Sequence, residues 1–292
     1  NRLGKSRSAR WLPTWNISGS WNVHEESFFK PLKSQISFLA LKGSYSLTAD
    51  RGPSNVTNSR VVIKSNSPWR PSAGDQESAL YISQLENSAL TYEKKHELNV
   101  GLSLGLLKNR INIEADWYKR NNYDLIGPIN AQGVGGQVDK MGNVASMKSS
   151  GIELTLSTRN IVTKDFSWTT DFIYAHTTNE ITKLENQQTV MNLIRGNGFG
   201  LEGYPVRSIF SIPFKGLNDE GLPQFLDQDG NVTTTGIYFQ ERDKIDFLEY
   251  SGTADPTDFG SVNNTFAIKN FKFNVFLTYS FGNVVRLDPV FK

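Results

Sequence analysis

Apolar and polar residues alternate strictly along much of the chain. In residues 98–106, Leu or Val occupies every second position, with Asn, Gly or Ser between. Successive side chains of a β-strand point to opposite faces, so this pattern predicts a strand with one apolar and one polar face. A helix would need spacings of three and four, and the interleaved Gly and Ser would weaken it. Alternation resumes over 111–118 after the short polar segment 107–110, which predicts a β-hairpin.

The same arrangement recurs from one end of the chain to the other. Further alternating runs lie at 15–23, 39–47, 152–157, 166–174, 266–268 and 271–281. Together they predict an all-β, antiparallel fold with about eight strands in about four hairpins. No helical periodicity of comparable length competes with them.

The lengths of the links between these strands also alternate. Links inside hairpins are mostly short, whereas the links between hairpins span 48–92, 122–149 and 177–260. Links this long are unusual in compact soluble domains, but short turns on one side and long loops on the other are typical of outer-membrane barrels. Within the long links, 61–64 and 237–240 have the composition of short strands.

Two architectures explain the alternation. A soluble β-sandwich, for example one that binds carbohydrate, would bury its apolar faces between two sheets. A membrane β-barrel would turn them towards lipid. The alternating link lengths favour the barrel. Its polar phase would then face a hydrated interior, and the charged residues in that phase are Glu97, Glu114, Asp116, Glu153, Asp171 and Lys272. A small stand-alone barrel acting as an adhesin or a structural protein is a further alternative.

Composition narrows the possible functions. The 292 residues include 31 Lys or Arg and 29 Asp or Glu, a net charge of +2 that does not indicate a nucleic-acid partner. The absence of Cys excludes disulfides, thiolate zinc sites and Cys nucleophiles. No apolar run approaches the roughly 20 residues of a membrane-spanning helix. The chain begins at Asn1 without Met or a signal-peptide pattern, and we expect it to be a piece of a longer protein.

Motifs for catalysis, metal or cofactor binding are not recognisable. The three His residues lie far apart, and no nucleophile elbow occurs. The segment 227–231 resembles the start of a calcium loop, but Val232 and Tyr238 occupy the positions that require Gly and Glu. We therefore predict a polar turn there, and neither an enzyme, a metal site nor a cofactor.

Residues in the long links are the candidates for substrate contact. They combine aromatic faces, which stack on sugar rings, with a guanidinium that can hold a carboxylate. The alternative for each is that it packs the loops together or meets a partner protein. The candidates are Trp69, Arg70, Tyr204 and Phe210.

Several segments resemble one known family. Residues 10–22 (RWLPTWNISGSWN), 39–48 (LALKGSYSLT), 90–94, 116–120 (DWYKR), 149–153 and 264–271 are similar to barrel segments of SusC/RagA-type TonB-dependent outer-membrane transporters. Each match is weak alone, but their order and spread over nearly the whole chain make the set specific.

This resemblance implies a barrel of about 22 strands in the bacterial outer membrane. Such a barrel is filled by an N-terminal plug, powered through the TonB complex and capped by a SusD-like surface lipoprotein, and it imports oligosaccharides or peptides. A plug, a TonB-contacting segment and a closing strand are not recognisable in this sequence. We therefore expect residues 1–292 to be an internal part of one barrel domain that contacts lipid, with the plug and the remaining strands outside this chain.

Overall fold

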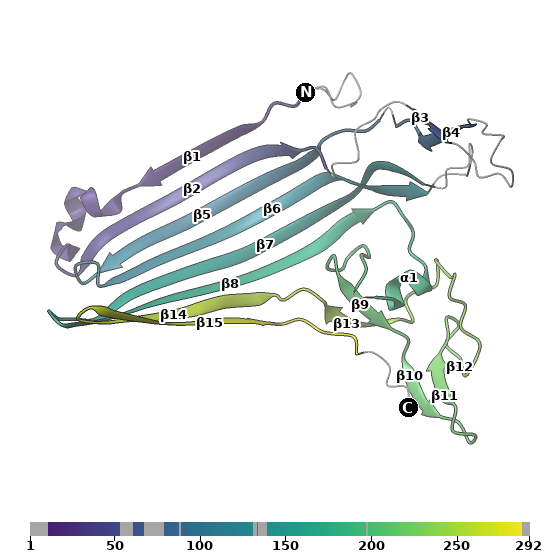
Figure 1. Ribbon diagram of the computed structural model, residues 1–292. Coiled ribbons are helices and arrows are strands. Elements are labelled where there is room, and N and C mark those ends of the chain that lie inside the picture. The colour runs from purple at the N-terminus through teal and green to yellow at the C-terminus, as the bar shows by residue number, and fades with distance from the viewer. Residues whose placement is uncertain are drawn as a thin grey trace, which may run out of the picture.

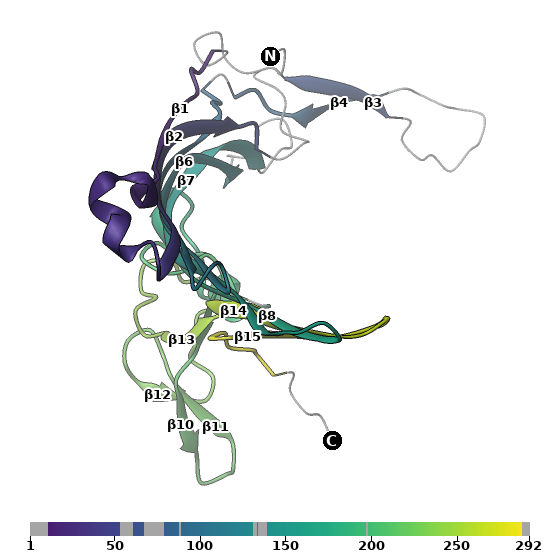
Figure 2. The ribbon, with the colours of Figure 1, turned by 90° about the vertical axis from the view of Figure 1, so that its left-hand side faces the viewer.

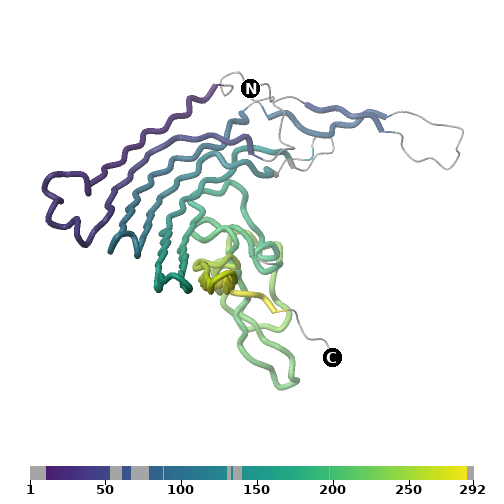
Figure 3. Tube along the Cα trace, turned by 60° about the vertical axis from the view of Figure 1, so that its left-hand side comes forward, coloured from purple at the N-terminus to yellow at the C-terminus, as the bar shows by residue number. Residues whose placement is uncertain are grey.

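One curved antiparallel sheet of eight strands is the main element of the fold (Figure 1, Figure 3). The computed structural model describes residues 11–52, 61–66, 79–87, 89–130, 133, 139–196 and 198–287. The sheet order is β1-β2-β5-β6-β7-β8-β14-β15. Its strands are β1 (Trp15–Trp21), β2 (Ile36–Asp50), β5 (Glu93–Leu106), β6 (Ile111–Asn130), β7 (Asp139–Val162), β8 (Phe166–Leu184), β14 (Asp258–Ile268) and β15 (Phe271–Phe281). The eight predicted strands and their four hairpins are confirmed.

The hairpin connections all lie at one end of the sheet, here called the turn end (left in Figure 1). The β5–β6 turn uses left-handed backbone at Leu107, Lys108 and Asn109, and the β14–β15 turn uses it at Lys269. The β1–β2 connection is longer and contains two short 3-10 helices, η2 (Val23–Glu25) and η3 (Ser27–Leu32).

The opposite end, here called the loop end, carries the other connections. The β2–β5 link contains a small hairpin, β3 (Val62–Asn66) and β4 (Ala79–Gln84). Residues 185–257 form the β8–β14 loop. It contains α1 (Val190–Ile194), β9 (Ser208–Ser211), β10 (Phe214–Leu217), β11 (Pro223–Leu226), β12 (Val232–Thr233) and β13 (Glu249–Thr253). The predicted separation of short turns from long loops is confirmed.

Three predictions about the links need correction. Most of the predicted link 122–149 is strand, because β6 continues to Asn130 and β7 begins at Asp139. A register shift after Asn122, with left-handed backbone at Asp124, interrupts the alternation that would have revealed this extension. The predicted link 177–260 is shorter at both ends, because β8 continues to Leu184 and β14 begins at Asp258. Residues 237–240 form no strand, because the carbonyl of Phe239 accepts a hydrogen bond from α1 instead.

In the middle of the sheet, the register places rows of mainly apolar residues beside rows of mainly polar residues. Residues opposite one another in an antiparallel pair share a face. One such row joins Leu41, Leu102, Ala115 and Leu154, and the adjacent row joins Lys42, Gly101, Asp116 and Glu153. All six charged residues assigned to the polar phase lie on this second face.

The polar face is the concave one. Figure 2 shows the sheet curved like part of a barrel wall, and side chains converge on the inner side of a curved sheet. On the polar face Ala40 is 1% exposed and Tyr118 is 7% exposed, whereas Val100 on the apolar face is 49% exposed. No second sheet covers the apolar face within the described residues, which does not fit a β-sandwich.

Neighbouring strands are staggered as barrel closure requires. Directly opposite residues can be followed from Leu106, the last residue of β5, across β6, β7, β8 and β14. This row reaches β15 at Val275, near the middle of that strand. A constant stagger of this kind tilts the strands relative to the barrel axis. No helix in the described part of the chain is long and apolar enough to cross a membrane.

Candidate functional site

Aromatic side chains lie at both ends of the convex face. At the loop end, ring centroids are 5.3 Å apart for Trp15 and Tyr45, 5.9 Å for Tyr45 and His96, and 6.0 Å for His96 and Tyr123. At the turn end, Phe266 lies between Trp168 and Phe273, with centroid distances of 5.7 and 6.4 Å. Aliphatic residues fill the space between. Two aromatic girdles around an aliphatic band are the pattern of a lipid-facing barrel surface.

The concave face carries charged residues that are only partly paired. Glu97 contacts the Lys95 ammonium at 2.7 Å and the Arg120 guanidinium at 3.1 Å, and this guanidinium also lies 4.0 Å from the Tyr118 ring centre. Asp171 accepts a 2.7 Å hydrogen bond from Ser157. Asp116 and Glu153 are directly opposite in the register, with Glu114 two residues along the strand, and Lys272 is exposed near the turn end.

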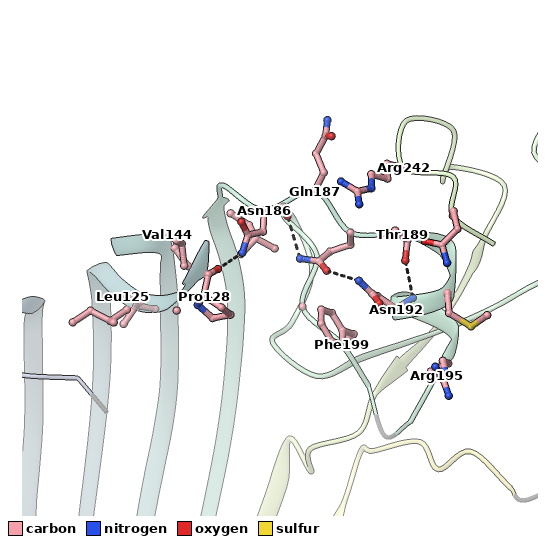
Figure 4. A pocket seen from close by; sticks show the side chains of 18 residues that line it. Leu125, Pro128, Val144, Asn186, Gln187, Thr189, Asn192, Arg195, Phe199 and Arg242 are labelled. Atoms are coloured by element: carbon pink, nitrogen blue, oxygen red, sulfur yellow. Dashed lines mark hydrogen bonds between the residues drawn. The ribbon is translucent and has the colours of Figure 1, made fainter. Parts of the chain in front are cut away.

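A cavity lies at the loop end, between the extended β6–β7 hairpin and the β8–β14 loop (Figure 4). It has a volume of about 670 Å³, within the usual range of ligand-binding cavities. Its lining residues are Leu125, Ile126, Gly127, Pro128, Val144, Ala145, Leu184, Asn186, Gln187, Gln188, Thr189, Met191, Asn192, Arg195, Phe199, Gly200, Gln240 and Arg242. We call it the loop-end cavity.

The hairpin side of the loop-end cavity is apolar and well anchored. Ile126 is buried and packs with Leu90 and Met141 in a small core. The Asn186 amide donates to the Pro128 carbonyl, and the Glu185 amide nitrogen donates to the Val144 carbonyl at 2.9 Å. The β8–β14 loop is therefore fastened to the tip of the hairpin.

The α1 side is built by polar side chains that bond to one another. The Thr189 hydroxyl caps α1 by accepting a hydrogen bond from the Asn192 backbone at 3.2 Å. The Gln188 side chain donates to the Asn186 carbonyl at 3.1 Å and accepts from the Asn192 amide at 3.4 Å. Val190 and Leu193 are fully buried behind this wall. These contacts fix the position of α1 against the cavity.

Four other polar side chains that line the cavity take no part in building its wall. Gln187, Gln240, Arg195 and Arg242 make no hydrogen bond or ion pair with any residue that the structure describes. Figure 4 shows Gln187 and Arg242 at one rim and Arg195 near the far end of α1. Among the described lining residues none is acidic. The free polar groups of this cavity are therefore amides and guanidinium groups.

Two of the residues predicted to contact substrate, Tyr204 and Phe210, do not line the loop-end cavity. Tyr204 and Phe210 form an aromatic cluster with Tyr250, with centroid distances of 5.0 to 5.6 Å (Tyr204–Phe210 and Phe210–Tyr250). Phe210 is 3% exposed, so an incoming molecule would meet the two tyrosines first. Trp69 and Arg70 lie outside the described residues. The sequence offered no motif for the loop-end cavity, because its residues come from separate segments that only the fold brings together.

The segment 227–231 is a polar turn. The nearly buried Asp227 carboxylate accepts hydrogen bonds from the backbone of Asn231 at 2.8 Å and of Asp229 at 2.9 Å. These bonds hold the pKa of Asp227 below its usual value. Asp229 in turn pairs with Lys244 at 2.5 Å, which raises the pKa of that lysine. The described residues contain no group of three or more His, Asp or Glu arranged to hold a metal ion.

Similarity to known proteins covers nearly the whole chain. It is 24% identical over 310 residues to TonB-dependent receptor P3 of Formosa agariphila, covering 98% of this chain and 29% of that receptor. It is 26% identical over 302 residues to TonB-dependent receptor SusC of Bacteroides thetaiotaomicron, covering 97% and 29%. The chain thus spans less than a third of the length of these relatives. No protein-family model matches it.

Solved structures share the fold. The RagAB peptide importer in its closed-closed state superposes with a TM-score of 0.74 at 22% identity, covering 96% of this chain and 30% of the other. The open-open state gives 0.75, covering 97% and 30%. The chain is similar to the barrel of SusC/RagA-type TonB-dependent receptors.

The SusC/RagA similarity settles several expectations. The antiparallel outer-membrane barrel fold and the location in the bacterial outer membrane are confirmed. The relatives are receptors and transporters rather than enzymes, which confirms the prediction of a non-enzymatic chain.

Proposed function

We propose that this chain is the wall and outer-loop segment of a TonB-dependent importer that takes up oligosaccharides or peptides together with a SusD-like lipoprotein. The observation that carries the proposal is the match to SusC/RagA-type barrels over nearly the entire chain. The role of the segment is passive. It supplies a lipid-facing surface, a polar inner wall and loops that enclose part of a substrate chamber.

The two faces of the sheet support this role. The convex face has aliphatic residues between aromatic girdles, and the concave face collects the charged residues. In a closed barrel Glu97, Glu114, Asp116, Glu153, Asp171 and Lys272 would line the interior. There they would remain hydrated or meet a plug, at little energetic cost compared with lipid.

The outer strands of the sheet support a larger barrel. β1 and β15 each have one neighbour in this sheet. An open edge leaves backbone groups unpaired, which hydrocarbon does not tolerate. We therefore propose that both edges pair with further strands of a barrel of about 22 strands, which also holds the plug that is coupled to TonB.

Substrate and partner follow from the relatives by analogy. RagAB is a peptide importer and SusC is a TonB-dependent receptor. A SusD-like lipoprotein would close the loop end, where the long links lie. Trp69, Arg70, Tyr204 and Phe210 remain candidate contacts for the substrate or for this partner.

Uptake by cells tests the proposal. Deleting the gene that encodes this chain should abolish uptake of one class of labelled oligosaccharide or oligopeptide, and restoring the gene should rescue it. The intact protein should co-purify with a lipoprotein. Normal uptake of both classes after deletion, without a lipoprotein partner, would instead support the stand-alone barrel.

The facing of the two surfaces can be tested by Cys labelling in a form of the intact protein without other Cys residues, since these 292 residues contribute none. A single Cys at Val100 on the convex face should react with a lipid-soluble maleimide in membranes. A single Cys at Asn99, its neighbour on the concave face, should react with a small water-soluble one. The reverse pattern would contradict the assignment of the two faces.

A further inference from the structure

The loop-end cavity combines a fixed wall with four unengaged polar side chains. Asn186, Gln188 and Asn192 are occupied in building the wall, so they hold the shape of the cavity. Gln187, Gln240, Arg195 and Arg242 are not needed for that purpose, since no contact with the described residues engages them. They are free to bond to a molecule inside.

The two arginines differ from other cations at the same end of the molecule. Lys94 pairs with Asp124 at 2.6 Å, Lys183 with Glu185 at 2.7 Å, and Arg207 with Asp255 at 2.7 Å. Arg195 and Arg242 have no carboxylate partner among the described residues. Guanidinium is always charged and its planar donors match a carboxylate in a two-pronged geometry. A cavity with two such groups and no acidic lining residue favours an anionic ligand.

The remaining lining residues indicate how the rest of such a ligand would be held. Carboxamides can both donate to and accept from hydroxyl or peptide groups. Phe199, Pro128 and Met191 add apolar surface. This mixture fits one unit of a polar oligomer better than a lipid or an aromatic cofactor.

We propose that the loop-end cavity is a subsite for a carboxylate-bearing unit of the imported oligomer. Arg242 at one rim and Arg195 near the far end of α1 are its two cationic contacts, and Gln187 and Gln240 hold the adjoining unit. The proposal rests on the proposed transport function and adds the chemical class of its substrate. The carboxylate has two possible sources, a uronic acid residue or the C-terminus of a peptide.

Calorimetry on the intact receptor with its lipoprotein tests the subsite. The probes are a galacturonate oligomer, a neutral hexose oligomer of the same length, and one oligopeptide with either a free or an amidated C-terminus. At least one carboxylate probe should bind more tightly than its neutral counterpart. Changing Arg195→Gln and Arg242→Gln together should weaken that binding about tenfold or more, since charge-assisted hydrogen bonds are lost. The neutral probes should not respond.

A matched variant controls for loss of charge. Arg207→Gln removes one positive charge from the same loop, but Arg207 does not line the cavity. It should leave the affinity of every probe unchanged. Added salt should weaken only the carboxylate probe in the unmodified receptor, which tests the charge without any substitution.

The outcomes separate the subsite from the transport function. A response to galacturonate identifies a uronic acid, and a response to the free but not the amidated peptide identifies a C-terminus. Equal behaviour of carboxylate and neutral probes, before and after substitution, overturns the subsite. If cells still import oligomers through the doubly substituted receptor as before, the transport function stands while the subsite falls.

Discussion

The eight-stranded sheet and the β8–β14 loop are stabilised in different ways. In the sheet, the backbone ladder runs through a regular register, and side chains sort into two faces. In the loop, single side chains organise the backbone. The Asn218 side chain accepts from the backbone of Glu220 and Leu222. The Glu241 carboxylate accepts hydrogen bonds from the backbone N–H groups of Arg242 and Asp243.

This difference teaches where each region is vulnerable. The alternation of apolar and polar residues specifies the sheet. Its stability is therefore most sensitive to a residue of the wrong polarity on one face, or to an added group where the packing leaves no space. A few polar side chains specify the loop, so its weak points are those individual groups. The predictions below test this division.

A charge on the convex face should have the largest effect. Leu102→Arg places a cation in the lipid-facing band and should lower the free energy of unfolding in bilayers by roughly 2–4 kcal/mol. Asn99→Arg is the matched control, because Asn99 lines a concave hollow of about 420 Å³ that also contains Asp116. Equal losses of unfolding free energy for both variants, measured by denaturant titration, would show that the two faces do not lie in different environments.

A methyl group at Gly260 should have the next largest effect. The Tyr279 ring crosses Gly260 so that its hydroxyl donates to the Ile173 carbonyl at 3.0 Å, and a Cβ there would collide with both groups. Gly260→Ala should therefore destabilise the sheet by about 1–3 kcal/mol. Gly19→Ala is the control, since no atom lies within 4 Å of its added methyl. Similar denaturant midpoints of unfolding for the two variants would contradict the close packing at Gly260.

Removing the α1 cap should act locally. Thr189→Ala removes the side-chain acceptor of the Asn192 backbone N–H and leaves only the Thr189 carbonyl at 3.0 Å, and loss of such a cap costs up to about 1 kcal/mol. Hydrogen exchange should increase in α1 and around the loop-end cavity but not in the sheet. Thr189→Ser keeps the hydroxyl and should behave like the unmodified protein. Faster exchange throughout the sheet would show that loop and sheet unfold together.

Acidification should have the smallest effect and should also be confined to the loop. Backbone N–H groups lower the pKa values of Asp227 and Glu241 in the folded state. A lowered folded pKa means that the stabilisation is present above the unfolded pKa, about 4 for these groups, and is lost as the pH falls through the folded pKa.

We therefore expect the β8–β14 loop to open more often below about pH 4, with the sheet unchanged. Hydrogen exchange corrected for its intrinsic pH dependence measures this. The double variant Asp227→Asn and Glu241→Gln should lose the pH dependence. An unmodified loop that is equally protected at neutral and acidic pH would refute the role of the two carboxylates.

The sequence predicts the strands correctly where apolar and polar residues alternate without interruption. The alternation in 98–106 and 111–118 predicted both β5 and β6, and their facing agrees with the register. It fails where a single residue breaks this alternation. Left-handed backbone at Asp124 shifts the register of β6, so the alternation predicts a link where the outer half of that strand lies.

The candidate site was less accessible to sequence reasoning than the sheet. Tyr204 and Phe210 were chosen by residue type, and the structure shows that they pack with Tyr250. The loop-end cavity depends on Pro128, Gln187 and Arg242, which no spacing connects. Only the pairing of β6 with β7 and the hydrogen bonds of α1 bring these residues around one space.

The longest links between strands lie together at the loop end, apart from the hydrogen-bonded strands of the sheet. Substitutions, insertions and deletions there change the surface of the loop end, while the backbone hydrogen bonds between the strands of the sheet are kept. The same sheet can therefore carry loops of different length and sequence. An epitope tag placed at that rim would exploit the same freedom.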